Sequence, residues 1–348
     1  YAVTGVQTCA PPIFVNVGDR VKVGQKIGES SAFVSGSIHA SIAGTVKEIK
    51  LMYIPTGMKT KCVVIENDGT DEMEDFQVSK SLEDLTSQEI IAIVKEKGIT
   101  GMGGASFPAH VKFSPPKEKP IDTVILNGAE CEPYLTGDHR IMLEYPELVV
   151  YGLKAVMKAL NVKNAYIAVE NNKMDAVEAL KKVIDPADSI QVVALKTKYP
   201  QGDEKRVIDA VTGRKVPTGG LPMDVGCVVS NVSTAKAIGE AVRFGKPLYE
   251  RIVTVTGKGI IEPKNLMARI GTPFGDLIRQ CGGFSGKPGK VISGGPMMGI
   301  AQFTLDVPII KGSGGILVMP AEDVKDDPVL PCIKCGKCIE VCPVGDRK

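Results

Sequence analysis

Four cysteines close to the end of the chain have the spacing that points most directly to chemistry. They form a C-x2-C-x2-C-x3-C-P run typical of bacterial ferredoxins, in which three thiolates hold one iron–sulfur cubane and the fourth serves a second cluster. Soft thiolates suit such clusters, whereas a structural zinc site more often shows two separated ligand pairs. The sequence therefore predicts 4Fe-4S ligands at Cys332, Cys335, Cys338 and Cys342.

A glycine-rich segment from Gly98 to Pro108 is a candidate cofactor loop. Glycines let a phosphate or a ring approach the backbone, and the amides at a following helix start can bind phosphate. Taken alone, such a loop is a weak signal. It also lacks the G-x-G-x-x-G spacing and has no strand leading directly into it, so it departs from the dinucleotide-binding fingerprint.

Three polar segments, residues 127–133, 199–204 and 230–234, each follow an apolar run that we expect to be a strand. Ligands of open parallel sheets bind beyond the carboxyl ends of the strands, so these positions suit a site. Carboxylates there could accept hydrogen bonds from sugar hydroxyls. A solvated acidic turn is the alternative for the first segment.

The elements that must position these residues differ along the chain. Residues 14 to about 68 alternate apolar and polar positions between glycines, which predicts short strands. The pattern resembles a biotinyl- or lipoyl-type sandwich, whose cofactor is carried on a hairpin lysine. Residues 29–37, at the place of that hairpin, contain no lysine, so we expect a structural barrel-sandwich.

A helix is predicted after Thr86, which forms a capping box with Glu89. Beyond residue 120, apolar runs at 124–126, 165–169 and 190–195 alternate with segments of helical periodicity, which indicates a doubly wound parallel sheet. After about residue 245 the pattern favours a small mixed α+β module. Residues 321–330 are acidic, contain proline and predict a linker.

Composition excludes several classes of function. Lys and Arg total 42 against 40 for Asp and Glu, a formal charge of +2, which argues against nucleic acid as a partner. No stretch approaches the roughly 20 apolar residues of a membrane-spanning helix. Scattered cysteines outside the terminal run, and an opening without a signal-peptide pattern, predict a reducing, cytoplasmic location. The three histidines and Cys131, Cys227 and Cys281 are expected to be structural.

The two ends predict that the chain is a fragment of a longer protein. Residues 3–13, apart from Pro11, resemble the translation of a common sequencing adapter, and 346–348 resemble the start of the reverse-strand adapter. The chain also continues for only six residues past Cys342 (348 − 342), without the second cysteine run that the first one needs. We therefore expect residues 1–13 to be non-native.

Taken together, the segments GMGGASFP, LNGAECEPY, YPQGDEK and SNVST resemble the flavin- and NADH-binding subunit of respiratory complex I. The whole chain from about 14 to 345 looks closer still to the family of C subunits of Rnf ion-translocating oxidoreductase complexes. That resemblance implies a multidomain α/β protein. It implies a β barrel-sandwich at 14–72, a Rossmann-like FMN/NADH domain at 73–245, a β-grasp domain at 246–320, and a linker with the first half of a ferredoxin-type domain at 321–348.

The resemblance also implies the binding residues, and no side chain is needed as a catalytic acid or base. Those implied for FMN and NADH are Gly101, Gly103, Gly104, Ala105, Phe107, Lys112, Asn127, Glu130, Glu132, Gly202, Asp203, Glu204 and Asn231. Met102, Ser106, Ala129 and Ser230 depart from the family pattern, and residues 215–223 lack a phenylalanine that would stack on NADH. Flavin binding is therefore more strongly indicated than nicotinamide binding.

The predicted function is electron transfer between NADH, FMN and 4Fe-4S clusters, two of them in the full-length protein. The partners would be the membrane and iron–sulfur subunits of the complex and, indirectly, ferredoxin. The chain would lie on the cytoplasmic face of the membrane without spanning it. One alternative is a soluble reductase with the same domains, such as a cobalamin reductase or a hydrogenase or formate dehydrogenase flavoprotein subunit. The other is a non-catalytic relay or docking subunit.

Overall fold

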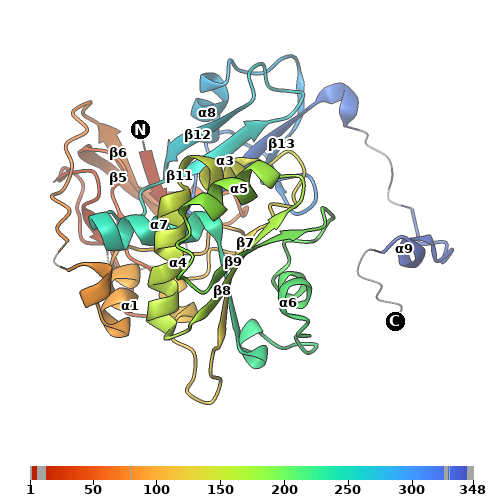
Figure 1. The fold of residues 1–348 in the computed structure, drawn as a ribbon. Coiled ribbons are helices and arrows are strands. Elements are labelled where there is room, and N and C mark those ends of the chain that lie inside the picture. Colours follow the sequence, from red (N-terminus) through yellow and green to blue (C-terminus); the bar gives the residue numbers. More distant parts are fainter. Residues whose placement is uncertain (1, 6–12, 79, 325–327, 329, 343–348) are drawn as a thin grey trace.

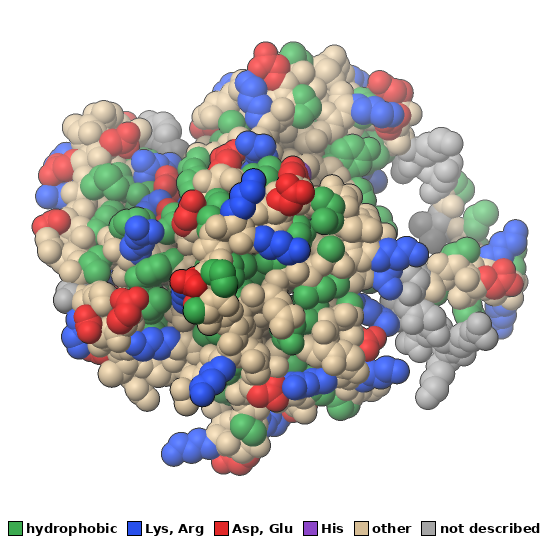
Figure 2. All heavy atoms as spheres, viewed as in Figure 1, with side chains coloured by type: hydrophobic (Ala, Val, Ile, Leu, Met, Phe, Trp, Pro, Cys, Tyr) green, Lys and Arg blue, Asp and Glu red, His purple; other side chains and the backbone are tan. Residues whose placement is uncertain are grey.

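The computed structural model describes residues 2–5, 13–78, 80–324, 328 and 330–342. These residues form three larger sheets, which follow one another along the chain, and one two-stranded sheet. Figure 1 shows how they are arranged. On the face of the molecule shown in Figure 2, acidic and basic side chains are interspersed and form no large patch of one charge. None of the helices in the described ranges has the length and apolar character required to cross a bilayer.

The N-terminal sheet has the order β1-β6-β5-β2, and a separate hairpin pairs β3 with β4. Its long strands are β5 (Gly44–Tyr53) and β6 (Lys59–Asn67). Its short strand β2 spans Arg20–Val21, and the separate hairpin consists of β3 (Lys26–Gly28) and β4 (Ile38–His39). Apolar side chains from both hairpins, including Val21, Ile27 and Ile65, form one core, which confirms the predicted barrel-sandwich.

Residues 2–5 form β1 (Ala2–Gly5), which pairs antiparallel with the edge of β6. A foreign segment would match the fold only by chance, yet residues 2–5 extend the sheet and Ile13 packs against the core of the barrel-sandwich. An exposed strand edge offers unpaired backbone groups to any extended segment, so the pairing carries no information on where the segment comes from. Its foreign origin stays a prediction, and residues 6–12 lie outside the described ranges.

The central domain begins with α1 (Ser87–Glu96), which follows the 3-10 turn η1 (Leu82–Asp84). Thr86 and Glu89 form the predicted capping box, and Ile90 and Val94 are buried. A four-stranded parallel sheet follows in the order β10-β7-β8-β9, as predicted. Its strands are β7 (Thr123–Gly128), β8 (Asn164–Glu170), β9 (Ile190–Leu195) and β10 (Cys227–Asn231).

Helices cover both faces of this sheet (Figure 1). One face carries α3 (Gly137–Glu144), α4 (Pro146–Leu160), α5 (Met174–Val183) and α7 (Val232–Phe244). The other carries α6 (Glu204–Thr212), together with the 3-10 turn η2 (Pro222–Val225). Val124 and Leu126 pack toward the first face and Ile125 toward the second, because side chains alternate along a strand.

Two glycines allow α4 and α7 to pack closely. A Cβ on Gly152 would lie 1.8 Å from the Ala235 carbonyl oxygen, and a Cβ on Gly239 would lie 2.5 Å from that of Leu148. Any larger residue at either position would push the two helices apart. This contact fixes α7, whose first residues border the site described below.

The C-terminal domain is a five-stranded mixed sheet in the order β12-β11-β15-β13-β14. Its strands are β11 (Glu250–Thr256), β12 (Lys264–Arg269), β13 (Pro288–Ser293), β14 (Ile300–Gln302) and β15 (Gly315–Pro320). The helix α8 (Phe274–Gln280) packs on it, which agrees with the α+β prediction. Beyond the 3-10 turn η3 (Ala321–Asp323), the short helix α9 (Lys337–Glu340) lies apart from the sheets in Figure 1.

Candidate functional site

A cavity of about 560 Å³ lies in the central domain, beyond the carboxyl ends of β7 and β10. The glycine-rich segment forms one wall, β10 and the start of α7 a second, and the start of α6 a third. The predicted cofactor residues that line it are Gly101, Gly103, Gly104, Ala105, Phe107, Lys112, Asn127, Gly202, Asp203, Glu204 and Asn231. Glu130 and Glu132 are not among its lining residues.

The glycine-rich segment is fixed at its base and open at its tip. The Gly101 amide donates to the Phe107 carbonyl at 2.8 Å, and the Met102 amide donates to Thr234 Oγ1 at 2.9 Å. A Cβ added to Gly104, whose φ is +157°, would meet no atom within 4 Å. The backbone of Gly104 therefore faces open cavity, and only glycine adopts its φ without strain.

A charged pair spans part of the cavity. Lys112, which ends α2 (Ala109–Lys112), donates from Nζ to Glu204 Oε1 and, at 3.1 Å, to the Val229 carbonyl. Both partners keep about a third or more of their side chains exposed, at 31% and 43%. An entering anion could therefore compete with Glu204 for the ammonium group.

The turns after β7 and β9 meet at the sheet edge, as their position after parallel strands predicted. Asn127 Nδ2 donates to the Gly202 carbonyl at 2.7 Å, and the Gly202 amide donates to Cys131 Sγ at 3.2 Å. Asp203 caps α6 by accepting from the amides of Lys205 and Arg206. The second turn thus presents Asp203 and Glu204 to the cavity, whereas the first presents Asn127.

Glu130 lies elsewhere than the predicted sugar-binding position. Its carboxylate accepts from the amides of Asp138 at 2.7 Å and His139 at 3.0 Å, and so stabilises the start of α3. Burial, followed by the neighbouring charge of Asp138, raises the pKa of Glu130 to about 8. The first four backbone amides of a helix have no acceptor within the helix. The carboxylate of Glu130 supplies one for the start of α3, and this contact accounts for its position.

Glu132 is also engaged outside the cavity. Its carboxylate accepts from the amides of Met297 at 3.2 Å and Met298 at 2.6 Å, in the loop between β13 and β14. Glu132 therefore links the central domain to the C-terminal domain. Neither of its oxygens is aimed at the cavity in this arrangement.

Asn231 connects the cavity to a buried polar group. Its side-chain oxygen caps α7 through the amides of Ser233 at 2.8 Å and Thr234 at 3.3 Å. Its Nδ2 donates to Asp138 Oδ2 at 2.6 Å, and Ser233 Oγ donates to the other oxygen of Asp138. Burial raises the pKa of Asp138. Asp138 therefore fixes the start of α7 from behind the cavity wall.

The cavity has the features that a flavin nucleotide requires. Its volume falls within the roughly 300–1,000 Å³ of small-molecule sites. Within the described part of the chain, the amides of Gly103, Gly104 and Ala105 have no acceptor, so they remain available to a ligand. Lys112 supplies a cation, and Asn127 and Asn231 add polar side chains to the wall, with their own hydrogen bonds made to the protein. The residues present therefore fit FMN.

Apart from the family resemblance, which placed residues 215–223 near NADH, no sequence signal identified the apolar part of the cavity wall. Leu221, Pro222 and Met223 of the η2 region line the cavity, as do Val228 and Val229 of β10. These are apolar residues without any distinctive spacing, and Ser230 and Thr234 belong to a segment singled out only for its polarity. Only the three-dimensional arrangement of β10 beside β7 brings them to the site.

The cysteine run has suitable donors that are not gathered into a site. Cys332, Cys335 and Cys338 are exposed, and their thiols form no disulfide. The Lys334 amide donates to Cys332 Sγ at 3.4 Å, and Gly336 has a φ of +76°. Across the ranges that the structure describes, no three Cys, His, Asp or Glu side chains are placed to hold a metal ion. The donor chemistry fits an iron–sulfur cluster, whereas the geometry is not preformed.

The remaining histidines and cysteines have structural contacts. His110 Nε2 lies 3.1 Å from the Phe33 carbonyl oxygen, and His139 Nε2 lies 2.8 Å from Asp175 Oδ1. His39 is buried, and burial lowers its pKa well below the usual value. Cys227 and Cys281 are buried, and Cys131 is the partly buried acceptor of the Gly202 amide.

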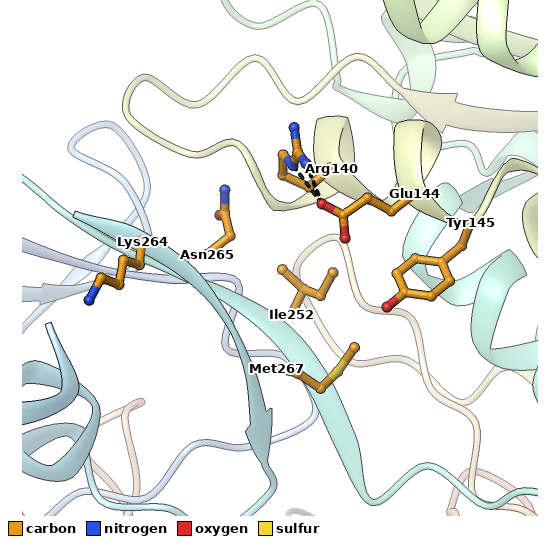
Figure 3. Close-up of a pocket in the computed structure, with 7 residues that line it drawn as sticks. All are labelled: Arg140, Glu144, Tyr145, Ile252, Lys264, Asn265 and Met267. Atoms are coloured by element: carbon orange, nitrogen blue, oxygen red, sulfur yellow. Dashed lines mark hydrogen bonds and ion pairs between the residues drawn. The ribbon is translucent and has the colours of Figure 1, made fainter. Parts of the chain in front are cut away.

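A second pocket of about 360 Å³ lies between α3 and β12 (Figure 3). Arg140 and Glu144 on α3 pair with each other at its rim. The edge strand β12 contributes Lys264, Asn265 and Met267. Each cation here already has a carboxylate partner, since Lys264 pairs with Glu262. This pocket contains none of the predicted cofactor residues, so the larger cavity is the candidate site.

Three family models match separate parts of the chain. The "RnfC Barrel sandwich hybrid domain" matches residues 7–70 and the "Nuo51 FMN-binding domain" matches residues 94–240. The "SLBB domain" matches residues 252–301. The second match contains every residue that lines the cavity, from Gly101 to Thr234.

Several curated proteins are similar over nearly the whole chain. The C subunit of the proton-translocating ferredoxin:NAD(+) oxidoreductase complex of Clostridium ljungdahlii is 52% identical over 95% of this chain and 72% of its own length. The C subunit of the Na(+)-translocating ferredoxin:NAD(+) oxidoreductase complex of Acetobacterium woodii is 49% identical over 97% of this chain and 76% of its own. The C subunit of the ion-translocating oxidoreductase complex of Rhodobacter capsulatus is 40% identical over 97% and 65%, respectively.

A solved structure of an NAD+-reducing [NiFe]-hydrogenase in the H2-reduced state contains a chain of similar fold. The TM-score is 0.59 at 20% identity, and the match covers 69% of this chain but only 48% of the hydrogenase chain. At that identity the likeness shows the fold alone.

Proposed function

The chain belongs to the family of C subunits of ion-translocating ferredoxin:NAD+ oxidoreductase complexes, and on that premise we propose that it transfers electrons between NADH, FMN and 4Fe-4S clusters. The observation that carries the proposal is the cavity beyond β7 and β10. It gathers the glycine-rich segment, Lys112 and the amides of Asn127 and Asn231 in one place.

Bound FMN would supply a carrier that accepts the two electrons of a hydride and passes them on singly, as an iron–sulfur partner requires. The chain's own residues bind and orient it. Gly104 allows close approach of a ring or a phosphate to the backbone, and Gly103 lets the segment pack against Asn231, whose Cβ would lie 3.1 Å from an added Cβ. Lys112 offers the positive charge, with Glu204 as its partner when no anion is bound.

Asp203 and Glu204 would accept hydrogen bonds from the sugar hydroxyls of NADH. Both line the cavity at the start of α6, and Glu204 is 43% exposed there. We leave Glu130 and Glu132 out of the proposed role because neither lines the cavity and their carboxylates accept from backbone amides of α3 and of the β13–β14 loop. The proposed NADH site therefore contains fewer acidic residues than the resemblance implied.

The cysteine run would hold one cluster, with Cys332, Cys335 and Cys338 as ligands, and Cys342 would serve a second cluster. The ferredoxin spacing of the four cysteines supports these roles, as do the exposed thiols of Cys332, Cys335 and Cys338. A second cysteine run beyond residue 348 would complete the pair of clusters. The complex's membrane and iron–sulfur subunits would be the partners, and ferredoxin an indirect one, with the chain peripheral at the cytoplasmic face of the membrane.

The two named ions, H+ and Na+, belong to different relatives, so the coupling ion does not carry over to this chain. A soluble reductase, such as a cobalamin reductase or a hydrogenase or formate dehydrogenase flavoprotein subunit, is less well supported than membership of the Rnf complex. Its support is a likeness of fold at 20% identity with one hydrogenase chain. A non-catalytic relay with a decayed pocket is disfavoured, because the cavity retains open space at Gly104 and free amides around it.

An anaerobic titration tests the proposal. The purified chain is loaded with FMN, freed of excess, and mixed with NADH while the flavin absorbance is followed. We expect one FMN per chain and stoichiometric bleaching by NADH. Failure to retain FMN would refute the flavin site, whereas retained FMN that NADH does not reduce would refute the NADH site alone.

A further inference from the structure

One buried arginine reaches from the C-terminal domain to the glycine-rich segment of the central domain. Arg251, the second residue of β11, is only 5% exposed. Its Nη1 and Nη2 each lie 3.3 Å from the Met102 carbonyl oxygen, and Nη1 also donates to the Lys311 carbonyl. Its Nε donates to the Ile252 carbonyl at 3.2 Å.

A second side chain from the same domain anchors the start of this segment. Lys311 donates from Nζ to the Gly98 carbonyl at 2.6 Å and to the Ser37 carbonyl at 2.8 Å. The carbonyls of Gly98 and Met102 flank Gly101. Two side chains from the C-terminal domain therefore hold the stretch from which the cavity wall begins.

Burial of the guanidinium is costly, and its partners are mostly neutral carbonyls. Burial lowers the pKa of Arg251 to about 10, which still leaves the side chain charged near neutral pH. Asp138 is the carboxylate whose charge acts on it. Asp138 also binds Asn231 and Ser233 at the start of α7. Arg251 and Asp138 together therefore contact both the glycine-rich segment and the start of α7, which form two walls of the cavity.

We infer that Arg251 is a positioning residue for the cofactor loop, so that the C-terminal domain sets the shape of the flavin site without touching the flavin. The inference rests on the proposed function, because it deepens the role of the same cavity. Glycines lose more conformational freedom on ordering than other residues, so Gly101, Gly103 and Gly104 need external anchors. Arg251 supplies one by fixing the carbonyl between the first two of these glycines.

The alternation of side chains along β11 explains how this strand contacts both α3 and the glycine-rich segment of the central domain. Successive side chains of a strand point to opposite faces. Ile252 lines the pocket against α3 in Figure 3, and Thr254 Oγ1, on the same face, accepts from the Thr136 amide at 3.3 Å. Arg251 therefore faces the other way, toward Met102, while its neighbours fix the strand against α3.

The test compares Arg251→Met, Arg251→Lys and Leu277→Ala with the unaltered chain. Leu277 is buried in the C-terminal core, so its truncation destabilises the same domain without touching the loop. Each protein is measured for FMN affinity, for the midpoint potential of bound FMN, and for hydrogen exchange at the amides of Gly101 and Met102. Exchange needs no flavin, so it reports on Arg251 even if the chain fails to bind FMN.

We expect Arg251→Met to weaken FMN binding by about tenfold to a hundredfold, the equivalent of losing hydrogen bonds from a charged group. In this variant the midpoint potential of bound FMN should shift, and the amides of Gly101 and Met102 should exchange faster. Arg251→Lys should recover part of each effect because it keeps a buried cation opposite Asp138. It also carries the test if the methionine variant does not fold.

Two results would overturn the inference. In the first, the Arg251 variants keep the wild-type FMN affinity, potential and loop exchange. In the second, Leu277→Ala changes all three as much as Arg251→Met does at the same loss of thermal stability. Absence of FMN binding in the unaltered chain would instead refute the proposed function, and faster loop exchange in Arg251→Met would still support the role of Arg251.

Discussion

The flavin cavity and the cysteine segment are both predicted redox sites, but the protein builds them in opposite ways. The cavity is shaped by the chain itself, through helix caps at Asp203 and Asn231 and hydrogen bonds that fix Met102 and Asn127. In the cysteine segment, the thiols of Cys332, Cys335 and Cys338 are exposed and unpaired.

The two sites differ because different interactions supply the free energy that holds their residues in place. The cavity walls belong to a core with dozens of buried apolar residues, so their geometry exists without a ligand. Thiolate ligands repel one another and converge only when a metal compensates them, so binding and local folding are one process. We therefore expect the first site to be preformed and the second to depend on its cluster.

The substitution Gly104→Val should have the largest effect, on the FMN affinity of the preformed cavity. A β-branched side chain at this φ would enter the open cavity, so FMN affinity should fall by more than about a hundredfold, or roughly 2.8 kcal/mol. Fluorescence titration with FMN measures this loss. Gly283→Val is the matched control, because Gly283 also has a positive φ and open space but lies in the C-terminal domain. Normal FMN binding by Gly104→Val would show that the cavity is not the flavin site.

Glu204→Gln tests the nicotinamide half of the cavity. We expect NADH affinity to fall by about one or two powers of ten, since a neutral amide is a weaker acceptor for sugar hydroxyls than a carboxylate. FMN should stay bound, since Lys112 keeps its charge and its contact with Val229. Glu178→Gln, a change on the exposed surface of α5, serves as the control in the same NADH titration. Unchanged NADH affinity in Glu204→Gln would remove this residue from the site.

The pH dependence of stability should report on Glu130, behind the cavity wall. Its folded-state pKa of about 8 lies above the usual value of 4.5, so its favourable contribution is complete below that value and is lost as pH rises through 8. Thermal midpoints should therefore fall by a few degrees between pH 6 and pH 9, and Glu130→Gln should flatten this slope. Glu147→Gln at the start of α4 is the control. An equal slope in both variants would rule out Glu130 as the cause.

The smallest expected effect is that of Cys335→Ser on the flavin site. Iron content after reconstitution with iron and sulfide should drop sharply, while FMN affinity changes by less than about twofold, a few tenths of a kcal/mol. Ile333→Ser, at an exposed position of the same segment, should change neither quantity. A matching loss of FMN in Cys335→Ser would show that the two regions are coupled in folding.

Sequence patterns predicted the elements better than the directions of side chains. The capping box at Thr86, the parallel strands and the polar helix starts all followed from local spacing, because caps and periodicity are local properties. The two turns were also correctly expected to meet. The carboxylates of Glu130 and Glu132 could not be placed, since their partners are amides at 138–139 and 297–298.

Long-range contacts account for what remained hidden. The spacing around Arg251 contains no motif, and its role is visible only once β11 lies beside the glycine-rich segment. The apolar residues 221–223 carry no motif of their own, and only the family resemblance placed their segment near NADH. A residue whose partners lie in another domain need not belong to any recognisable pattern in the sequence around it.

The most direct test of the account is an FMN titration of the purified chain before and after treatment with an iron chelator, with the iron content measured in both samples. We predict one FMN per chain and the same dissociation constant in both, because the cavity is formed by the apolar core and helix caps rather than by the cluster. Binding that requires iron, or no saturable binding in either sample, would contradict it.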